Sequence, residues 1–164
     1  FPFMRRHSEA YLQQHPEERG KDAATTRAAC EKYALVPTSV MNFLEGTRCT
    51  PAKQKRQQSP YQHLLKPKAG GVTLALDAMG EKFGAVLDIT IVYPGGTPTF
   101  WHFLLGRVAE VIVETRTLPV PAVQPAPGQD GAQALRDTCQ KWVNQLWRDK
   151  DARITELLAR QSPP

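Results

Sequence analysis

Four neighbouring residues of the chain, Glu45-Gly46-Thr47-Arg48, combine an acid, a flexible hinge, a hydroxyl and a guanidinium. The planar fork of donors on Arg48 matches a phosphate group in two-point fashion, and Thr47 adds a hydroxyl donor. Gly46 lets the backbone adopt a positive φ or approach a ligand closely. Glu45 can hold the guanidinium or accept a hydrogen bond from a substrate hydroxyl. The pattern indicates an anion-binding turn, and a charged surface turn that only faces water is the alternative.

The segment before this turn predicts the element that positions it. Residues 38–43 are rich in β-branched and apolar side chains and follow Pro37, so we expect a strand that ends at the turn. Ligands of open α/β sheets bind at the carboxyl ends of strands, which is where the turn would lie.

Several sequence blocks resemble those of a known enzyme family. Phe43-Leu44-Glu45-Gly46-Thr47-Arg48 resembles the third block of the glycerolipid acyltransferases, the family of 1-acylglycerol-3-phosphate acyltransferase, with Leu44 where that family usually has Pro. Phe3-Met4-Arg5-Arg6 is similar to the second block and places the family's basic residue at Arg6. Segments 65–71 and 87–94 and a Trp-containing terminal helix are similar to the lysophosphatidic and lysocardiolipin acyltransferase branch. Within bacteria, the chain resembles probable inner-membrane acyltransferases of Gram-negative species.

The resemblance implies transfer of a fatty acyl group from acyl-CoA or acyl-carrier protein to a lysophospholipid, with 1-acyl-sn-glycerol 3-phosphate as the expected acceptor. Arg6 and Arg48 would hold the acceptor phosphate, while Glu45, Gly46 and Thr47 would shape the pocket around the glycerol. No metal and no redox cofactor is expected, because a thiolate leaves the thioester readily. The expected location is the cytoplasmic face of the bacterial inner membrane.

The first block of that family, a His followed five positions later by an Asp, has no counterpart here. The residues five positions after the four histidines are Leu12, Gly20, Lys68 and Arg107. The sequence therefore predicts no catalytic residue in this chain. We expect the chain to be the latter part of a longer protein, inactive by itself and with its membrane anchor upstream. A non-catalytic module that binds phosphate or anionic lipid is the competing hypothesis.

Charge is unevenly distributed along the chain. Residues 1–68 hold twelve Lys or Arg against six Asp or Glu, whereas the remainder holds nine against ten. A basic surface near the turn would attract an anionic membrane surface. The alternative is a solvated face, in which Thr50 caps a short helix that carries Lys53, Lys55 and Arg56 outward. No motif for nucleic-acid binding accompanies the basic residues, so nucleic acid is not an expected partner.

Cysteine spacing and hydropathy exclude some other classes of protein. Cys30, Cys49 and Cys139 are odd in number and widely spaced, which favours a reducing compartment over a disulfide framework or a zinc site. No apolar run reaches the ~18 residues that a membrane-spanning helix needs.

The expected fold is α/β, with a mixed, mostly parallel sheet flanked by helices and a long C-terminal amphipathic helix. Helices are predicted over 22–33 and 71–79, the latter closed by Gly80, a buried parallel strand over 85–93 and a further strand over 109–116. Asp88 and Thr90 share one face of the first strand, where they either line the acceptor pocket or make hydrogen bonds within the fold. His102 is interpreted as a packing residue rather than a catalytic one.

The C-terminal region divides at a proline-rich segment. Residues 1–118 are assigned to the latter part of an acyltransferase domain, 119–131 to a stiff connector, and 132–164 to the C-terminal helix, with 161–164 frayed. Apolar residues recur in that helix at spacings of three and four, which predicts a stripe that docks on the core or on a partner helix. The stripe comprises Leu135, Cys139, Trp142, Val143, Leu146, Trp147, Ile154, Leu157 and Leu158.

Overall fold

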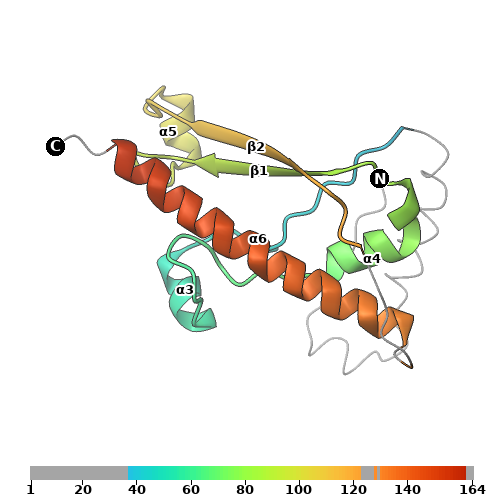
Figure 1. Cartoon of the computed structure of the whole chain (residues 1–164). Helices are drawn as coiled ribbons and strands as arrows, with labels where there is room; N and C mark the ends of the chain where they lie inside the picture. The colour runs from blue at the N-terminus through green and yellow to red at the C-terminus, as the bar shows by residue number, and fades with distance from the viewer. Residues whose placement is uncertain (1–36, 123–127, 129, 162–164) are drawn as a thin grey trace, which may run out of the picture.

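The computed structural model describes residues 37–122, 128 and 130–161 (Figure 1). Arg6 and the helix predicted over 22–33 lie outside the described residues, as do residues 123–127 and 129 of the proline-rich connector and residues 162–164. The elements are, in chain order, α3 (Pro51–Gln57), α4 (Gly70–Met79), the 3₁₀ helix η2 (Gly80–Lys82), β1 (Val86–Val92), α5 (Phe100–Leu104), β2 (Ile112–Leu118) and α6 (Gly131–Gln161).

The long helix α6 runs the length of the described structure, and α4 and β1 pack on it (Figure 1). In Figure 1 the hairpin of β1 and β2 lies along its C-terminal half, and α4 lies against its N-terminal half. The predicted apolar stripe is confirmed, because every member is buried or half-buried. It forms one cluster around Ala69, Cys139 and Val143 and a second around Val92, Ile154 and Leu157.

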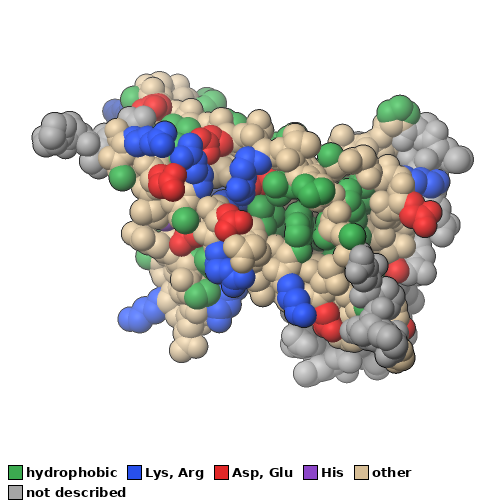
Figure 2. Space-filling model, viewed as in Figure 1, with side chains coloured by type: hydrophobic (Ala, Val, Ile, Leu, Met, Phe, Trp, Pro, Cys, Tyr) green, Lys and Arg blue, Asp and Glu red, His purple; other side chains and the backbone are tan. Residues whose placement is uncertain are grey.

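The opposite side of α6 is polar and carries charges of both signs. On the face drawn in Figure 2, basic and acidic side chains alternate over the C-terminal half of α6 and the adjoining strands. Among the charged residues of α6, Arg153 pairs with Glu114 of β2 and with Glu156 one helical turn along. Such alternation agrees with a helix that docks on its own core through one stripe.

The sheet differs from the predicted one. β1 and β2 pair antiparallel, with Val86 opposite Leu118 and Val92 opposite Ile112, so the described strands do not form the expected mostly parallel sheet. Helices with a small sheet still make the described fold mixed α/β. The strand predicted over 85–93 is buried on one face only, because α6 covers Asp88, Thr90 and Val92 while the alternate side chains are exposed.

Asp88 and Thr90 play a role within the fold, as one of the two interpretations predicted, and their partner is Lys150 of α6. The Lys150 ammonium lies 2.5 Å from Asp88 Oδ1, and it donates to Thr90 Oγ1 at 3.0 Å and to the Ile89 carbonyl at 2.9 Å. Arg116 of β2 binds the other carboxylate oxygen of Asp88 at 2.8 Å. A buried charged cluster therefore fixes the register of the hairpin on α6.

Residues 38–43 do not form the predicted strand. They run extended and unpaired by any described strand, and Met41 and Phe43 are more than three-quarters exposed. The segment instead leans on the start of α4, where a Cβ on Gly71 would lie 2.4 Å from Asn42 Nδ2. Its β-branched and apolar composition predicted a strand, but a strand also needs a neighbour to pair with.

The short helix α5 contradicts the packing role predicted for His102. Thr99 caps this five-residue helix, and the aromatic and aliphatic side chains around His102 are all exposed, as is His102 itself. No element of the described part of the chain covers the hairpin tip on which α5 lies. None of the described helices is both long enough and apolar enough to cross a membrane.

Candidate anion-binding site

The segment Phe43–Arg48 forms a tight turn. The Gly46 amide donates to the Phe43 carbonyl at 2.9 Å, and Gly46 itself adopts a φ of 66°. A residue with a Cβ is strained in this left-handed conformation, so glycine suits the position. The chain turns where the sequence predicts it, with the hydrogen bond closing at Gly46, although no strand leads into the turn.

The turn is anchored to the core on one side. The Leu44 carbonyl accepts a hydrogen bond from the Lys68 amide at 2.8 Å, and the Leu44 side chain packs against the cluster of Ala69, Cys139 and Val143. Leu44 stands where the resembled family usually has Pro, and here it supplies apolar contact. Leu44 therefore fixes one side of the turn to the core, while Thr47 and Arg48 on the other side are exposed to solvent.

Glu45 points into the protein and not toward Arg48. Its carboxylate accepts a hydrogen bond from the Leu65 amide at 3.1 Å, and Leu65 is fully buried. Burial raises the pKa of Glu45, while the Leu65 amide, the Trp147 indole and the Lys150 ammonium act in the opposite direction. The indole Nε1 of Trp147 completes no hydrogen bond of good geometry with the described residues, so its effect on Glu45 is that of a nearby dipole. The expectation that Glu45 holds the guanidinium is therefore wrong for this structure.

Arg48 lies on the open side of the turn. Its side chain is exposed, and among the described residues it has no hydrogen-bond or ion-pair partner. A shallow, open hollow of about 450 Å³ adjoins it and is lined by Asn42, Phe43, Gly46, Thr47 and Arg48. A guanidinium at the edge of such a hollow is available to an anion that enters from solvent.

A second cation, Lys53 of α3, binds the same turn. Its ammonium donates to Thr47 Oγ1 at 2.6 Å and to the Arg48 carbonyl at 3.2 Å. Thr50 caps α3 as predicted, since its hydroxyl accepts from the Lys53 amide at 3.4 Å. The sequence left open whether Lys53 belongs to a basic surface near the turn or, with Lys55 and Arg56, to an outward face of the helix. The missed signal was its place three residues after the cap, a position whose side chain folds back toward the preceding segment.

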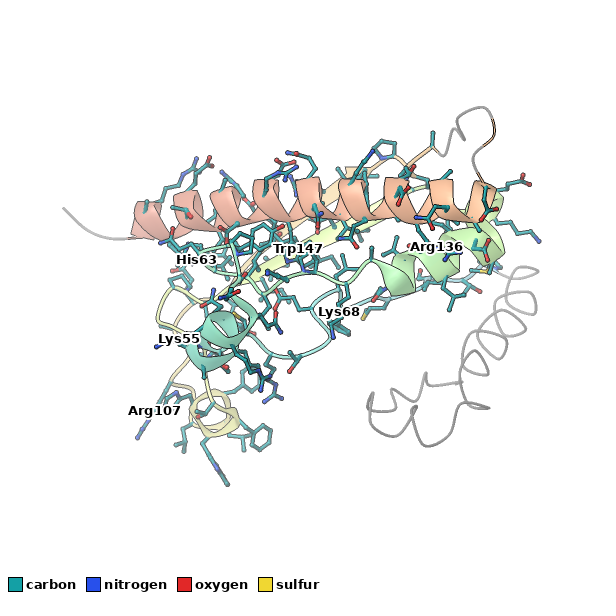
Figure 3. All side chains as sticks on the ribbon, turned by 90° about the horizontal axis from the view of Figure 1, so that it is seen from below. Lys55, His63, Lys68, Arg107, Arg136 and Trp147 are labelled. Atoms are coloured by element: carbon teal, nitrogen blue, oxygen red, sulfur yellow. The ribbon has the colours of Figure 1, made fainter. Side chains whose placement is uncertain are left out.

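The neighbouring cations are exposed. Lys55 lies on the outer side of α3, away from α6, and Lys68 lies on the segment between α3 and α4 (Figure 3). Cys49, next to Arg48, has a raised pKa because of its burial and the nearby Glu45 charge, so its thiol stays protonated near neutral pH. The solvent side of the turn is therefore basic.

The described residues hold no cluster of three or more His, Cys, Asp or Glu side chains that could bind a metal. Neither of the two described histidines forms a hydrogen bond with the Phe43–Arg48 turn. His63 bonds to Thr155 of α6 at 3.0 Å, and His102 projects from α5.

Comparison with known proteins finds lipid acyltransferases. Lysocardiolipin acyltransferase 1 of Danio rerio is 30% identical over 130 residues, which is 72% of this chain and 31% of the relative. The Mus musculus protein of the same name is 27% identical over 130 residues. The 1-acyl-sn-glycerol-3-phosphate acyltransferase gamma of Mus musculus is 26% identical over 119 residues, 67% of this chain and 29% of the relative. These similarities support the acyltransferase family.

The extent of the match limits what it supports. The chain spans about a third of the length of these relatives. No family model matches the chain, and no solved structure matches it significantly. The expected acyltransferase class thus has support, whereas the assignments of Arg6, Glu45, Gly46, Thr47 and Arg48 and the bacterial source stay predictions.

Proposed function

We propose that this chain supplies the acceptor-binding part of a lysophospholipid acyltransferase. The observation that carries the proposal is the position of the Arg48 guanidinium beside an open hollow. No described residue forms an ion pair or hydrogen bond with this guanidinium, and the turn that holds it is anchored to the core. A phosphate monoester is the complementary ligand, because its oxygens can take two parallel hydrogen bonds from the guanidinium. The similarity to acyltransferases with lysocardiolipin and 1-acyl-sn-glycerol 3-phosphate in their names supports a lysophospholipid as its carrier.

In the proposed reaction, the free hydroxyl of 1-acyl-sn-glycerol 3-phosphate attacks the carbonyl carbon of an acyl-CoA or acyl-carrier-protein thioester. A C–O bond forms, the C–S bond breaks, and the thiolate leaves. Arg48 holds the phosphate, together with Arg6 in the prediction from sequence, and the Gly46-Thr47 backbone borders the glycerol. The hydroxyl proton passes to the His of a His-Asp pair with the family's spacing; none of the four histidines in this sequence has an Asp five positions later.

We propose a structural role for Glu45 in place of the predicted contact with the guanidinium or the substrate. Its bond to the Leu65 amide ties the turn to the interior, so it acts on Arg48 by fixing the backbone. We propose further that the surface near Lys55, Lys66 and Lys68 faces anionic lipid, at the cytoplasmic side of a bacterial inner membrane. Exposed cations at an anionic surface each contribute about 1 kcal/mol to binding.

A binding experiment tests the acceptor site. The chain is titrated with short-chain 1-acylglycerol 3-phosphate and with the matching 1-acylglycerol, which lacks the phosphate. We expect the phosphate ligand to bind more tightly, and Arg48→Ala to weaken it by about tenfold to a hundredfold, since a charge-assisted contact contributes about 1.5–3 kcal/mol. Arg56→Ala, which removes an exposed cation of α3, is the matched control. Equal binding of both ligands, or an Arg48→Ala variant that binds as the parent does, would refute the assignment.

A further inference from the structure

We propose that Lys53 is a positioning residue of the phosphate site, a proposal that rests on the function above. Its ammonium lies 2.6 Å from Thr47 Oγ1 and 3.2 Å from the Arg48 carbonyl, and both of these residues line the hollow. An ammonium carries three donors, and these contacts use two of them. That leaves one N–H as a donor for an oxygen of a bound phosphate monoester.

The surroundings of Lys53 hold it in this place. Lys53 is half-buried, whereas Lys55 and Arg56 on the same helix are exposed. Gln54 fixes α3 from the other side, because its side-chain amide donates to the Gln62 carbonyl at 2.9 Å. The helix therefore presents Lys53 to the turn from a defined position.

Two consequences for ligand binding follow from these contacts. The bond to the Arg48 carbonyl fixes the backbone from which the guanidinium extends, so less conformational freedom is lost when Arg48 takes up a phosphate. The ammonium also places a second positive charge beside the same hollow, which raises the local preference for a doubly charged phosphate monoester over an uncharged ligand. Lys53 thus acts on the site through Thr47 and the Arg48 backbone as well as through its charge.

The test uses the whole chain with Lys53→Met, Lys53→Arg and the control Lys141→Met, which changes an exposed lysine of α6. Each is titrated with inorganic phosphate, glycerol 3-phosphate, short-chain 1-acylglycerol 3-phosphate and 1-acylglycerol, and followed by calorimetry. We expect Lys53→Met to weaken the phosphate-bearing ligands by about tenfold, the scale of one lost charge-assisted hydrogen bond. Lys53→Arg should restore most of the affinity, and Lys141→Met should bind as the parent does. Binding of uncharged 1-acylglycerol should not change. A loss of affinity for this ligand as well would indicate that the variant disturbs the fold and not only the phosphate site.

The ligand arms and the controls make each outcome decisive. A loss confined to the acylated phosphate assigns the site to a lipid headgroup, and a loss with inorganic phosphate as well assigns it to the phosphate group alone; both uphold the role of Lys53. Parent-like phosphate binding by Lys53→Met, alongside a weakened Arg48→Ala, overturns this role and leaves the proposed function standing. Absence of phosphate binding by the parent chain overturns both. If Lys53→Met does not fold, Lys53→Gln, which keeps a donor but not the charge, is judged by the same criteria.

Discussion

Replacement of Lys150 by Met should destabilise the folded chain, and should do so more than the same replacement of Lys141, the other lysine of α6. Lys150 is 6% exposed and Asp88 is 8% exposed, so the variant leaves a buried carboxylate without its closest cation. Removal of one partner of a buried ion pair costs about 3–5 kcal/mol. Arg116 remains on the other carboxylate oxygen of Asp88, so we expect the lower end, about 3 kcal/mol.

Urea unfolding, followed by the fluorescence of the tryptophans, measures this cost. With a slope of about 2 kcal/mol/M, a loss of about 3 kcal/mol lowers the unfolding midpoint by roughly 1.5 M. Lys141→Met, an exposed lysine of the same helix, is the control and should change stability by less than about 0.5 kcal/mol. The double variant Asp88→Asn, Lys150→Met should be more stable than the sum of its single changes predicts, since it leaves no buried carboxylate without its cation, and Arg116, which loses Asp88, is partly exposed to water. A midpoint for Lys150→Met equal to that of the parent would refute the buried-pair argument.

Two further predictions concern the turn itself. The folded-state pKa of Glu45 is raised, so as pH increases the unfolded chain loses this proton first and the ionised carboxylate increasingly disfavours the folded state. Glu45→Gln should therefore improve stability relative to the parent more at pH 7 than at pH 4 in urea unfolding, and an identical difference at the two pH values would contradict this sign. Gly46→Ala should cost about 1–2 kcal/mol, because the φ of 66° is strained for alanine, and Gly70→Ala in α4, which meets no atom within 4 Å, is its control. Equal unfolding midpoints for the two alanine variants would show that the turn relaxes.

Local sequence signals predicted α3, α4 and α6, whereas the five-residue helix α5 was not predicted. The spacing of Leu135, Cys139 and Val143 predicted the buried stripe of α6, since a helix places residues three and four apart on one face whatever packs against it. Thr50 and Pro51 predicted the start of α3 in the same way, because capping involves only neighbouring residues. The helix over 71–79 is confirmed to within one residue, although Gly80 ends it with a φ of −52° and leads into η2 without a left-handed cap.

Strand partners and exposure could not be predicted as reliably. The apolar run around Ile89 and Ile91 matched a strand buried on both faces, but only α6 covers it, so alternate side chains are exposed. His102 stands among aromatic residues that sequence reasoning places in a core, yet the described fold leaves α5 uncovered. Burial depends on which elements meet, and that information is not contained in a local window of sequence.

The sequence by itself determined the Glu45–Arg48 turn, its chemistry and its resemblance to acyltransferases, because these depend on residue types at short spacing. Only the tertiary structure decided what each side chain does. It turned Glu45 inward to the Leu65 amide, brought Lys53 onto Thr47, and gave Asp88 a buried partner 62 residues away in Lys150. Contacts of this kind arise when α6 packs on the rest of the chain, since the free energy of burial selects partners that are distant in sequence.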